Sequence, residues 1–125
     1  MRKLFVATVL ALVLGACASM GGAPTAAKFE GGMLVDSAGM TLYTFDKDAA
    51  GSGKSACNGP CANNWPPLHA TGSDQASGDW SVIARDDGSK QFAYKGKPLY
   101  HWVKDQKPGD KTGDGFLKLW HVATQ

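Results

Sequence analysis

The sequence predicts an all-β domain, a small sandwich or barrel-like fold made from two tandem repeats of short antiparallel strands. The stretch "GMTLYTFDKD" at residues 39–48 returns as "GKPLYHWVKD" at residues 96–105, about 57 positions later. Between such stretches, short β-type runs are broken by Gly, Asp and Asn, the chain holds 16 glycines, and no segment keeps a helical period over three turns. Each repeat would have one apolar face that only the other repeat can cover, which predicts a packed pair.

The first repeat is expected at about residues 30–70. The run "MLVDSAGMTLYTF" predicts a hairpin of strands 33–36 and 40–45 that turns at residues 37–39. A polar, Gly-rich loop follows, and Trp65 then leads into a short apolar end at Leu68.

The second repeat is expected at about residues 80–125 and follows the same plan. Residues 80–103 predict three strands that turn at Asp87-Gly88 and at Lys95-Gly96, since Asp-Gly favours a tight hairpin turn. Pro98 has no N–H, so its strand should lie at an edge or begin there. A second Gly-rich loop precedes a last strand, "LKLWHVA".

The repeated motif itself indicates a packing role. Its members are Tyr43, Phe45 and Asp48 in the first copy and Tyr100, Trp102 and Asp105 in the second. Because alternate residues of a strand share a face, each Tyr should point with the following aromatic residue, and Leu42 and Leu99 should point the other way. The two Asp residues are expected to accept turn hydrogen bonds from backbone N–H groups. We interpret the motif as structural rather than as a ligand-stacking surface.

The N-terminus predicts export and a lipid anchor. Residues 1–16 have the charged start and short apolar run of a signal peptide, too short for a membrane span. The stretch "LGAC" that ends at Cys17 is similar to a bacterial lipobox, which implies lipidation of Cys17 and attachment to the membrane. An ordinary signal peptide with a chance Cys is the alternative. Residues 17–29 are expected to be a flexible tether and residues 30–125 the folded, duplicated domain.

The net charge after signal cleavage limits the kinds of partner that the mature protein could bind. Of the 13 basic residues, Arg2 and Lys3 leave with the signal, so 11 basic residues face 11 acidic ones and the mature chain is formally neutral. That balance and the exported location exclude nucleic acid as a partner. Ala18 after the lipidated Cys resembles an outer-membrane sorting signal, which predicts a cell-envelope protein facing the periplasm or the surface.

Two cysteines remain for the folded domain. Cys57 and Cys61 are an even pair in an oxidising compartment, and their spacing permits a disulfide in a turn or first helical turn. The alternative is a thiol-redox or Cu(I) site, since thiolates suit this soft ion. His69, or Met40, would then be a further ligand.

A calcium site is a second candidate. Asp110, Thr112 and Asp114 fall at positions one, three and five of a calcium-loop spacing. The twelfth position, normally a bidentate acid, is His121, which favours a polar turn with solvated carboxylates instead. No nucleophile has a neighbouring base in the sequence, so we expect neither an enzyme nor a cofactor.

The tandem Tyr-x-(Phe/Trp/Tyr)-x-x-Asp motif, the lipobox, "CNGPCANNWPPL" and "GKPLYHWVKDQKPGDKTGDG" together resemble the secreted-repeat family of predicted bacterial lipoproteins. The resemblance implies an envelope location and a tandem-repeat domain, and it brings no catalytic residues. The expectation is a lipid-anchored protein with a binding or structural role, whose partner is an envelope protein or a small ligand. The alternative is a metal- or redox-handling protein that uses Cys57 and Cys61.

Overall fold

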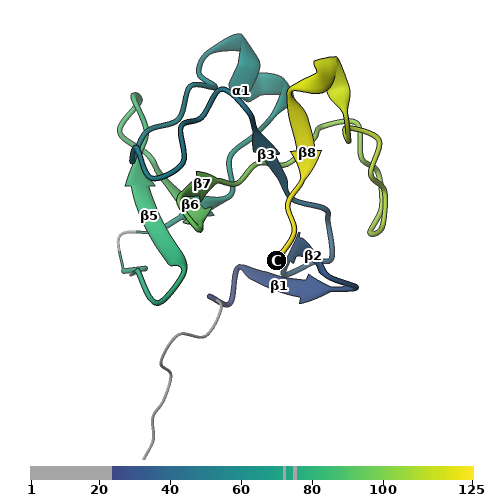
Figure 1. Ribbon diagram of the computed structural model, residues 1–125, viewed down its shortest axis with the longest axis horizontal. Coiled ribbons are helices and arrows are strands. Elements are labelled where there is room, and N and C mark those ends of the chain that lie inside the picture. Colours follow the sequence, from purple (N-terminus) through teal and green to yellow (C-terminus); the bar gives the residue numbers. More distant parts are fainter. Residues whose placement is uncertain (1–23, 72, 75) are drawn as a thin grey trace, which may run out of the picture.

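The computed structural model describes residues 24–71, 73–74 and 76–125 (Figure 1). The strands in this part of the chain are β1 (Ala27–Glu30), β2 (Met33–Asp36), β3 (Tyr43–Phe45), β4 (His69–Ala70), β5 (Trp80–Ala84), β6 (Lys90–Tyr94), β7 (Lys97–Pro98) and β8 (Trp120–Val122). Helix is limited to α1 (Pro60–Asn64) and the 3-10 turn η1 (Phe116–Lys118). All strand pairs are antiparallel, so the predicted all-β class is confirmed.

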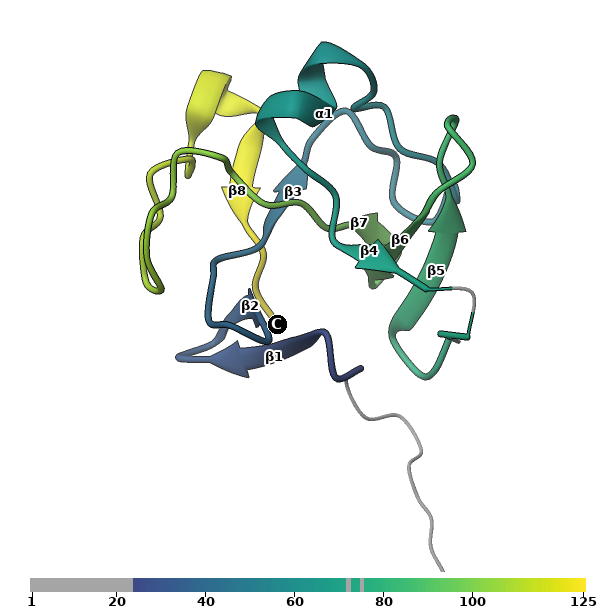
Figure 2. The same ribbon diagram turned by 180° about the vertical axis from the view of Figure 1, so that it is seen from behind.

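The strands form three small sheets. β1 pairs with β2, β3 pairs with β8, and β6 lies between β4 and β5 and also pairs with β7. Figures 1 and 2 show β3 and β8 side by side, although they come from different repeats. These sheets do not close into a barrel within the described residues.

The first hairpin differs from the predicted one. β1 pairs with β2 through a two-residue turn at Gly31 and Gly32, whose φ values of 59° and 82° suit glycine. β1 therefore begins at Ala27, inside the segment predicted as a tether. The turn predicted at residues 37–39 also forms, since Asp36 N–H donates to the Met40 carbonyl at 2.8 Å, but it joins only an isolated bridge between Val35 and Thr41.

The second repeat matches its prediction more closely. β5 and β6 form a hairpin that turns at Asp87-Gly88, and β6 and β7 turn at Lys95-Gly96. Gly96 cannot be replaced without strain, since an added Cβ would lie 2.6 Å from the Gly51 nitrogen. The last strand is shorter than expected, because η1 occupies residues 116–118 before β8 begins.

The two repeats are joined at the middle of the molecule. Tyr43 N–H donates to the Tyr100 carbonyl at 2.8 Å, and Tyr100 N–H donates to the Tyr43 carbonyl at 2.9 Å. Neighbouring backbone hydrogen bonds of the two repeats also correspond. Leu34 N–H donates to the Ala123 carbonyl, and Phe92 N–H donates to the Leu68 carbonyl, each at 2.9 Å. The repeats thus form one body with approximate two-fold symmetry.

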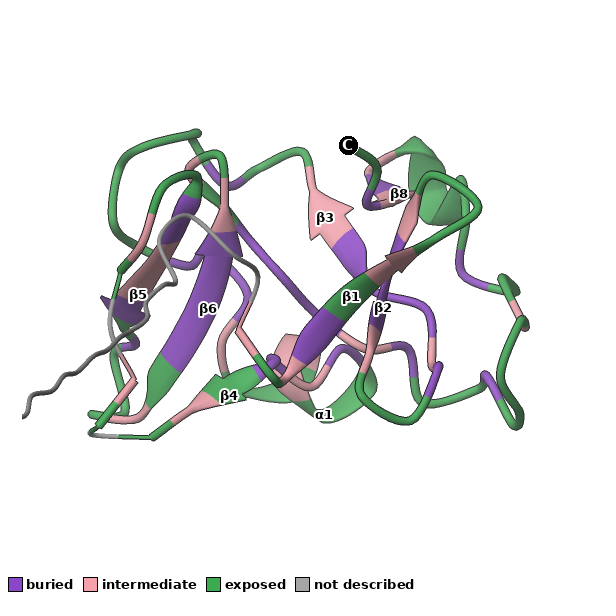
Figure 3. Cartoon of the chain, turned by 90° about the horizontal axis from the view of Figure 1, so that it is seen from below, coloured by how far each residue is buried: buried purple, intermediate pink, exposed green. Residues whose placement is uncertain are grey.

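Two hydrophobic cores lie on opposite sides of the central strands. One contains Leu42 and Leu99 with Leu34, Trp80 and Phe92. The other is made of the side chains of Tyr43, Tyr100, Trp65, Trp102 and Trp120 together with Cys57. The predicted separation of the Leu and Tyr faces is confirmed. Figure 3 shows that β6 is buried over most of its length, consistent with its central place in its sheet.

Candidate functional site

The repeated motif forms two hydrogen bonds that cross between the repeats. The Tyr43 hydroxyl donates to Asp105 Oδ2 at 2.7 Å, and the Tyr100 hydroxyl donates to Asp48 Oδ2 at 2.5 Å. Each Tyr therefore bonds to the Asp of the other copy. Asp48 also accepts the N–H of Ala56 at 2.6 Å, as expected for a turn residue. In the second repeat, Asp105 likewise accepts a backbone hydrogen bond within the loop that follows it, from the N–H of Thr112 at 2.9 Å.

A stack of four rings lies beside these hydrogen bonds. Trp65 and Trp120 stack at 3.8 Å between ring centroids with 1° between their planes. Phe45 stacks on the outer face of Trp120 and Trp102 on that of Trp65, each at 4.1 Å. Tyr43 meets Trp65 edge-on at 5.3 Å, and its counterpart Tyr100 meets Trp120 at 5.1 Å. Tyr43, Tyr100 and Trp102 are thus core residues and Phe45 packs against them partly buried, which supports the structural interpretation of the motif.

Burial controls the ionisation of this network. It raises the pKa values of Tyr43 and Tyr100 far above the usual tyrosine range, and the hydrogen bonds to Asp105 and Asp48 add to the effect. Burial also raises the pKa of Asp48, against the hydrogen bonds from Tyr100 and Ala56 and the charge of Arg85, which lower it. Both tyrosines are therefore held as neutral donors, poorly suited to act as bases at neutral pH.

We expect the protein to lose stability at alkaline pH. A tyrosine whose pKa is raised on folding contributes stability that is complete below its unfolded pKa of about 10 and is lost as the pH rises toward the folded value. Two such groups should lower the free energy of unfolding by about 2.7 kcal/mol per pH unit above about pH 10. Denaturant titrations across this range test the slope, which should halve in Tyr43→Phe.

The control uses a Tyr94→Phe background, because the chain has three tyrosines and this change leaves only Tyr43 and Tyr100. Tyrosinate absorbance should then rise only as the protein unfolds. Tyrosinate that forms in the folded protein near pH 10 would contradict the network.

Arg85 extends the network to the disulfide. It is 5% exposed, and its guanidinium donates to the Cys57 carbonyl at 2.6 Å, to Gln91 Oε1 at 2.7 Å and to Ser55 Oγ at 3.1 Å. Ser55 in turn lies 2.6 Å from the Tyr100 hydroxyl. Cys57 is bonded to Cys61 at the start of α1, with 5.2 Å between their Cα atoms. The predicted disulfide is therefore present, and it joins α1 to the buried network. The role of Arg85 was not foreseen.

The structure does not bring the candidate metal ligands together. Within the described residues no group of three or more His, Cys, Asp or Glu side chains could hold a metal ion. The Cys57 and Cys61 sulfurs are bonded to each other, and the third copper candidate, His69, is an exposed residue of β4. The second alternative ligand, Met40, donates its N–H to Asp36 in a turn.

The calcium candidates are engaged in separate loop contacts. Asp110 accepts from the N–H groups of Gln106 and Lys107, and Thr112 donates its hydroxyl to Asp105. Asp114 accepts the N–H of Val122 at 3.1 Å. The carboxylates therefore fix turns, and they do not converge on one point. Cys17 lies outside the described residues, so lipidation stays a prediction.

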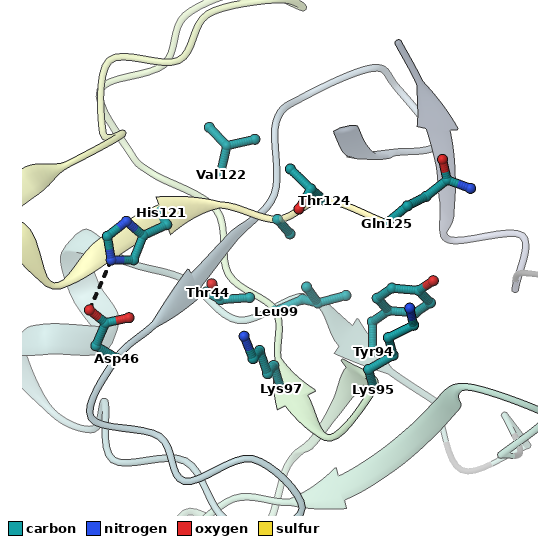
Figure 4. A pocket seen from close by; sticks show the side chains of 11 residues that line it. Thr44, Asp46, Tyr94, Lys95, Lys97, Leu99, His121, Val122, Thr124 and Gln125 are labelled. Carbon is teal, nitrogen blue, oxygen red and sulfur yellow. Dashed lines mark hydrogen bonds and ion pairs between the residues drawn. The ribbon is translucent and has the colours of Figure 1, made fainter. Parts of the chain in front are cut away.

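A polar cleft of about 280 Å³ lies between the β3–β8 pair and the end of β6 (Figure 4). On one wall His121 Nε2 lies 2.9 Å from Asp46 Oδ2. On the other, the side chains of Lys97 and Lys95 enter with Tyr94. The lysines and Asp46 carry opposite charges, so the cleft does not select strongly for either sign of ligand.

A second, more open hollow lies between the end of α1 and η1. It has a volume of about 720 Å³ and is lined by Asn64, Trp102, Lys104, Gln106, Thr112 and Phe116. The exposed large hydrophobic residues of the described chain, Val103, Phe116 and Leu117, all belong to the segment 103–117 beside it. Sequence reasoning missed Asn64 and Phe116, because only the folded chain brings them to Trp102.

Comparison with known proteins identifies the family. Residues 25–69 and 81–124 match the Lipoprotein_15 family, described as a secreted repeat of unknown function. No curated protein and no solved structure matches the chain. In the part that the structure describes, no helix has the length and apolar character needed to cross a bilayer. Each match covers one structural repeat, and together they span more than half of the chain, so the protein belongs to this family of extracytoplasmic tandem-repeat proteins.

Proposed function

We propose that the protein is a lipid-anchored component of the bacterial envelope that acts as a non-catalytic binding module. One observation carries this proposal. The hydroxyls and carboxylates of the repeated motif are used in contacts between the repeats, whereas exposed apolar side chains gather beside one open hollow. A hollow in which an exposed aromatic ring lies among polar side chains suits binding.

The position of the proposed lipid anchor near the start of β1 supports a hollow that faces away from the membrane. Lipid on Cys17 would leave seven residues, 17–23, before the described chain, with a reach of at most ~25 Å. A compact domain of this size is roughly 33 Å across, from a radius of gyration of about 13 Å. Figures 1 and 2 show α1 and η1 at the opposite end from β1, where the described chain begins. The hollow would therefore lie on the side away from the anchoring membrane.

The test is native mass spectrometry of the protein extracted gently from membranes, with an unfolded sample beside it. We expect a chain that starts at Cys17, carries lipid, lacks two hydrogens at Cys57 and Cys61, and holds no metal. The matched variant Cys17→Ser should no longer be found in the membrane fraction but should keep the disulfide.

Two results would contradict parts of this proposal. A chain without lipid would remove the anchor. Copper or another ion retained until unfolding, or reduced thiols at Cys57 and Cys61, would favour the metal- or redox-handling alternative.

A further inference from the structure

We infer that the open hollow, the Trp102 hollow (Asn64, Trp102, Lys104, Gln106, Thr112 and Phe116), binds a carbohydrate chain that carries carboxylate groups. This inference deepens the proposed function and rests on it, because it names the ligand class of the proposed binding module.

The wall of the hollow has the chemistry that sugar rings need. The Phe116 ring, which is 40% exposed, supplies the open aromatic surface, and the buried Trp102 ring packs against it at 5.0 Å with 41° between the two planes. The C–H face of a pyranose carries partial positive charge and packs on the negative face of an aromatic ring. Asn64 and Gln106 add side-chain amides, which offer both donors and acceptors to hydroxyl groups and have no partner among the described residues.

This wall is held in place before any ligand arrives. Trp102 stacks on Trp65 in the buried four-ring stack, and it is only 7% exposed. Gly113 lies flat against both rings, since a Cβ added there would be 2.7 Å from Trp65 and 2.9 Å from Trp102. Thr112 is fixed by its two hydrogen bonds to Asp105. A rigid wall lowers the entropy cost of binding.

The charges around the hollow favour an acidic ligand. No carboxylate is among the described side chains that line the hollow: Asp105 is buried and accepts from Tyr43 and Thr112, and Asp110 pairs with Lys107 at 3.0 Å. Lys104 lines the hollow and has no ion-pair partner in the described chain. An ammonium group beside an aromatic wall can bind a carboxylate substituent of a sugar.

The first repeat supplies an internal comparison. The 57-residue repeat spacing matches Lys47 to Lys104 and Ala49 to Gln106. The hollow at Lys47 measures about 210 Å³, and no aromatic side chain lines it. The aromatic wall and the Gln106 amide therefore distinguish the second repeat, where the ligand should bind.

The experiment is titration calorimetry of the whole mature protein with hexagalacturonate, with neutral cellohexaose and with polyglutamate of similar charge. We expect saturable binding of hexagalacturonate, weaker binding of cellohexaose and none of polyglutamate. Gln106→Ala, which restores the residue of the first repeat, should weaken binding about 5-fold through the loss of one hydrogen bond. Phe116→Ala should weaken it about 10-fold, with folding checked by circular dichroism. Lys104→Ala should abolish the preference for hexagalacturonate.

The control is Lys47→Ala, the equivalent lysine in the hollow without aromatic residues, which should leave affinity within about 2-fold. The inference is overturned if neither saccharide binds, if polyglutamate binds equally well, or if Lys47→Ala weakens binding as much as Lys104→Ala. Failure here would leave the lipid and metal results from mass spectrometry unchanged, so the two proposals can fail separately.

Discussion

Replacement of Trp65 by Ala should lower the free energy of unfolding by about 3–5 kcal/mol, the usual cost of removing a large buried aromatic side chain. Trp65 is an inner ring of the four-ring stack, 3% exposed, with Trp120 on one face, Trp102 on the other and Tyr43 at its edge. Total stabilities of small domains are about 5–15 kcal/mol, so this variant should be marginal or unfolded. Urea denaturation followed by far-ultraviolet circular dichroism gives the value.

Alanine variants at the other rings of the stack provide a comparison with Trp65→Ala. Trp120→Ala should cost about as much as Trp65→Ala, because both rings have a neighbour on each face. Phe45→Ala should cost less, since Phe45 is only partly buried and ends the stack. A loss below about 1 kcal/mol for Trp65→Ala would show that the stack contributes little to stability.

Replacement of Asp105 by Ala should lower the free energy of unfolding by about 2–4 kcal/mol, the largest effect expected for a polar residue of the motif. Asp105 is 8% exposed and accepts three hydrogen bonds, from the Tyr43 hydroxyl and from the backbone and hydroxyl of Thr112. Bonds to a charged acceptor are worth about 1.5–3 kcal/mol each, and the loss is less than their sum because water can reach Thr112. Denaturant titration at neutral pH measures the change.

The matched control is Asp79→Ala, which removes an exposed aspartate from the turn before β5. Its stability should stay within about 0.5 kcal/mol of the parent chain. An Asp105→Ala variant as stable as this control would mean that the motif carboxylate is not a structural element.

The sequence predicted the packing of the motif because strand geometry is local. Alternation along a strand is enough to separate Leu42 and Leu99 from Tyr43 and Tyr100, and the two sets do enter different cores. The Asp-Gly turn at residues 87–88 follows from local backbone preference in the same way.

The other features depend on contacts distant in sequence. Neither copy of the motif by itself indicates that the Tyr43 hydroxyl bonds to Asp105 rather than to Asp48. The pairing of Tyr43 with Tyr100 in the folded chain determines this partner. The small residues before β1 place its residues 27–29 in the predicted tether, although Gly31-Gly32 is a strong hairpin signal. Arg85 precedes an exposed turn, so the sequence predicts a surface residue. In the folded chain its guanidinium donates to the Cys57 carbonyl.

The candidate site was less predictable than the fold. Asn64, Trp102 and Phe116 come from three separate segments and meet only in the folded chain. A residue-by-residue comparison of the repeats offers the one sequence signal, because Lys47 and Lys104 agree whereas Ala49 and Gln106 differ.

A double-mutant cycle tests most directly the central claim, that each copy of the motif completes the other. The variants are Tyr43→Phe with Asp105→Ala, and Tyr43→Phe with Asp48→Ala. The structure predicts a coupling of about 1–2 kcal/mol for the first pair, which shares a 2.7 Å hydrogen bond, and additivity within about 0.5 kcal/mol for the second. Coupling between Tyr43 and Asp48, with additivity between Tyr43 and Asp105, would contradict the exchange and mean that each repeat is self-contained.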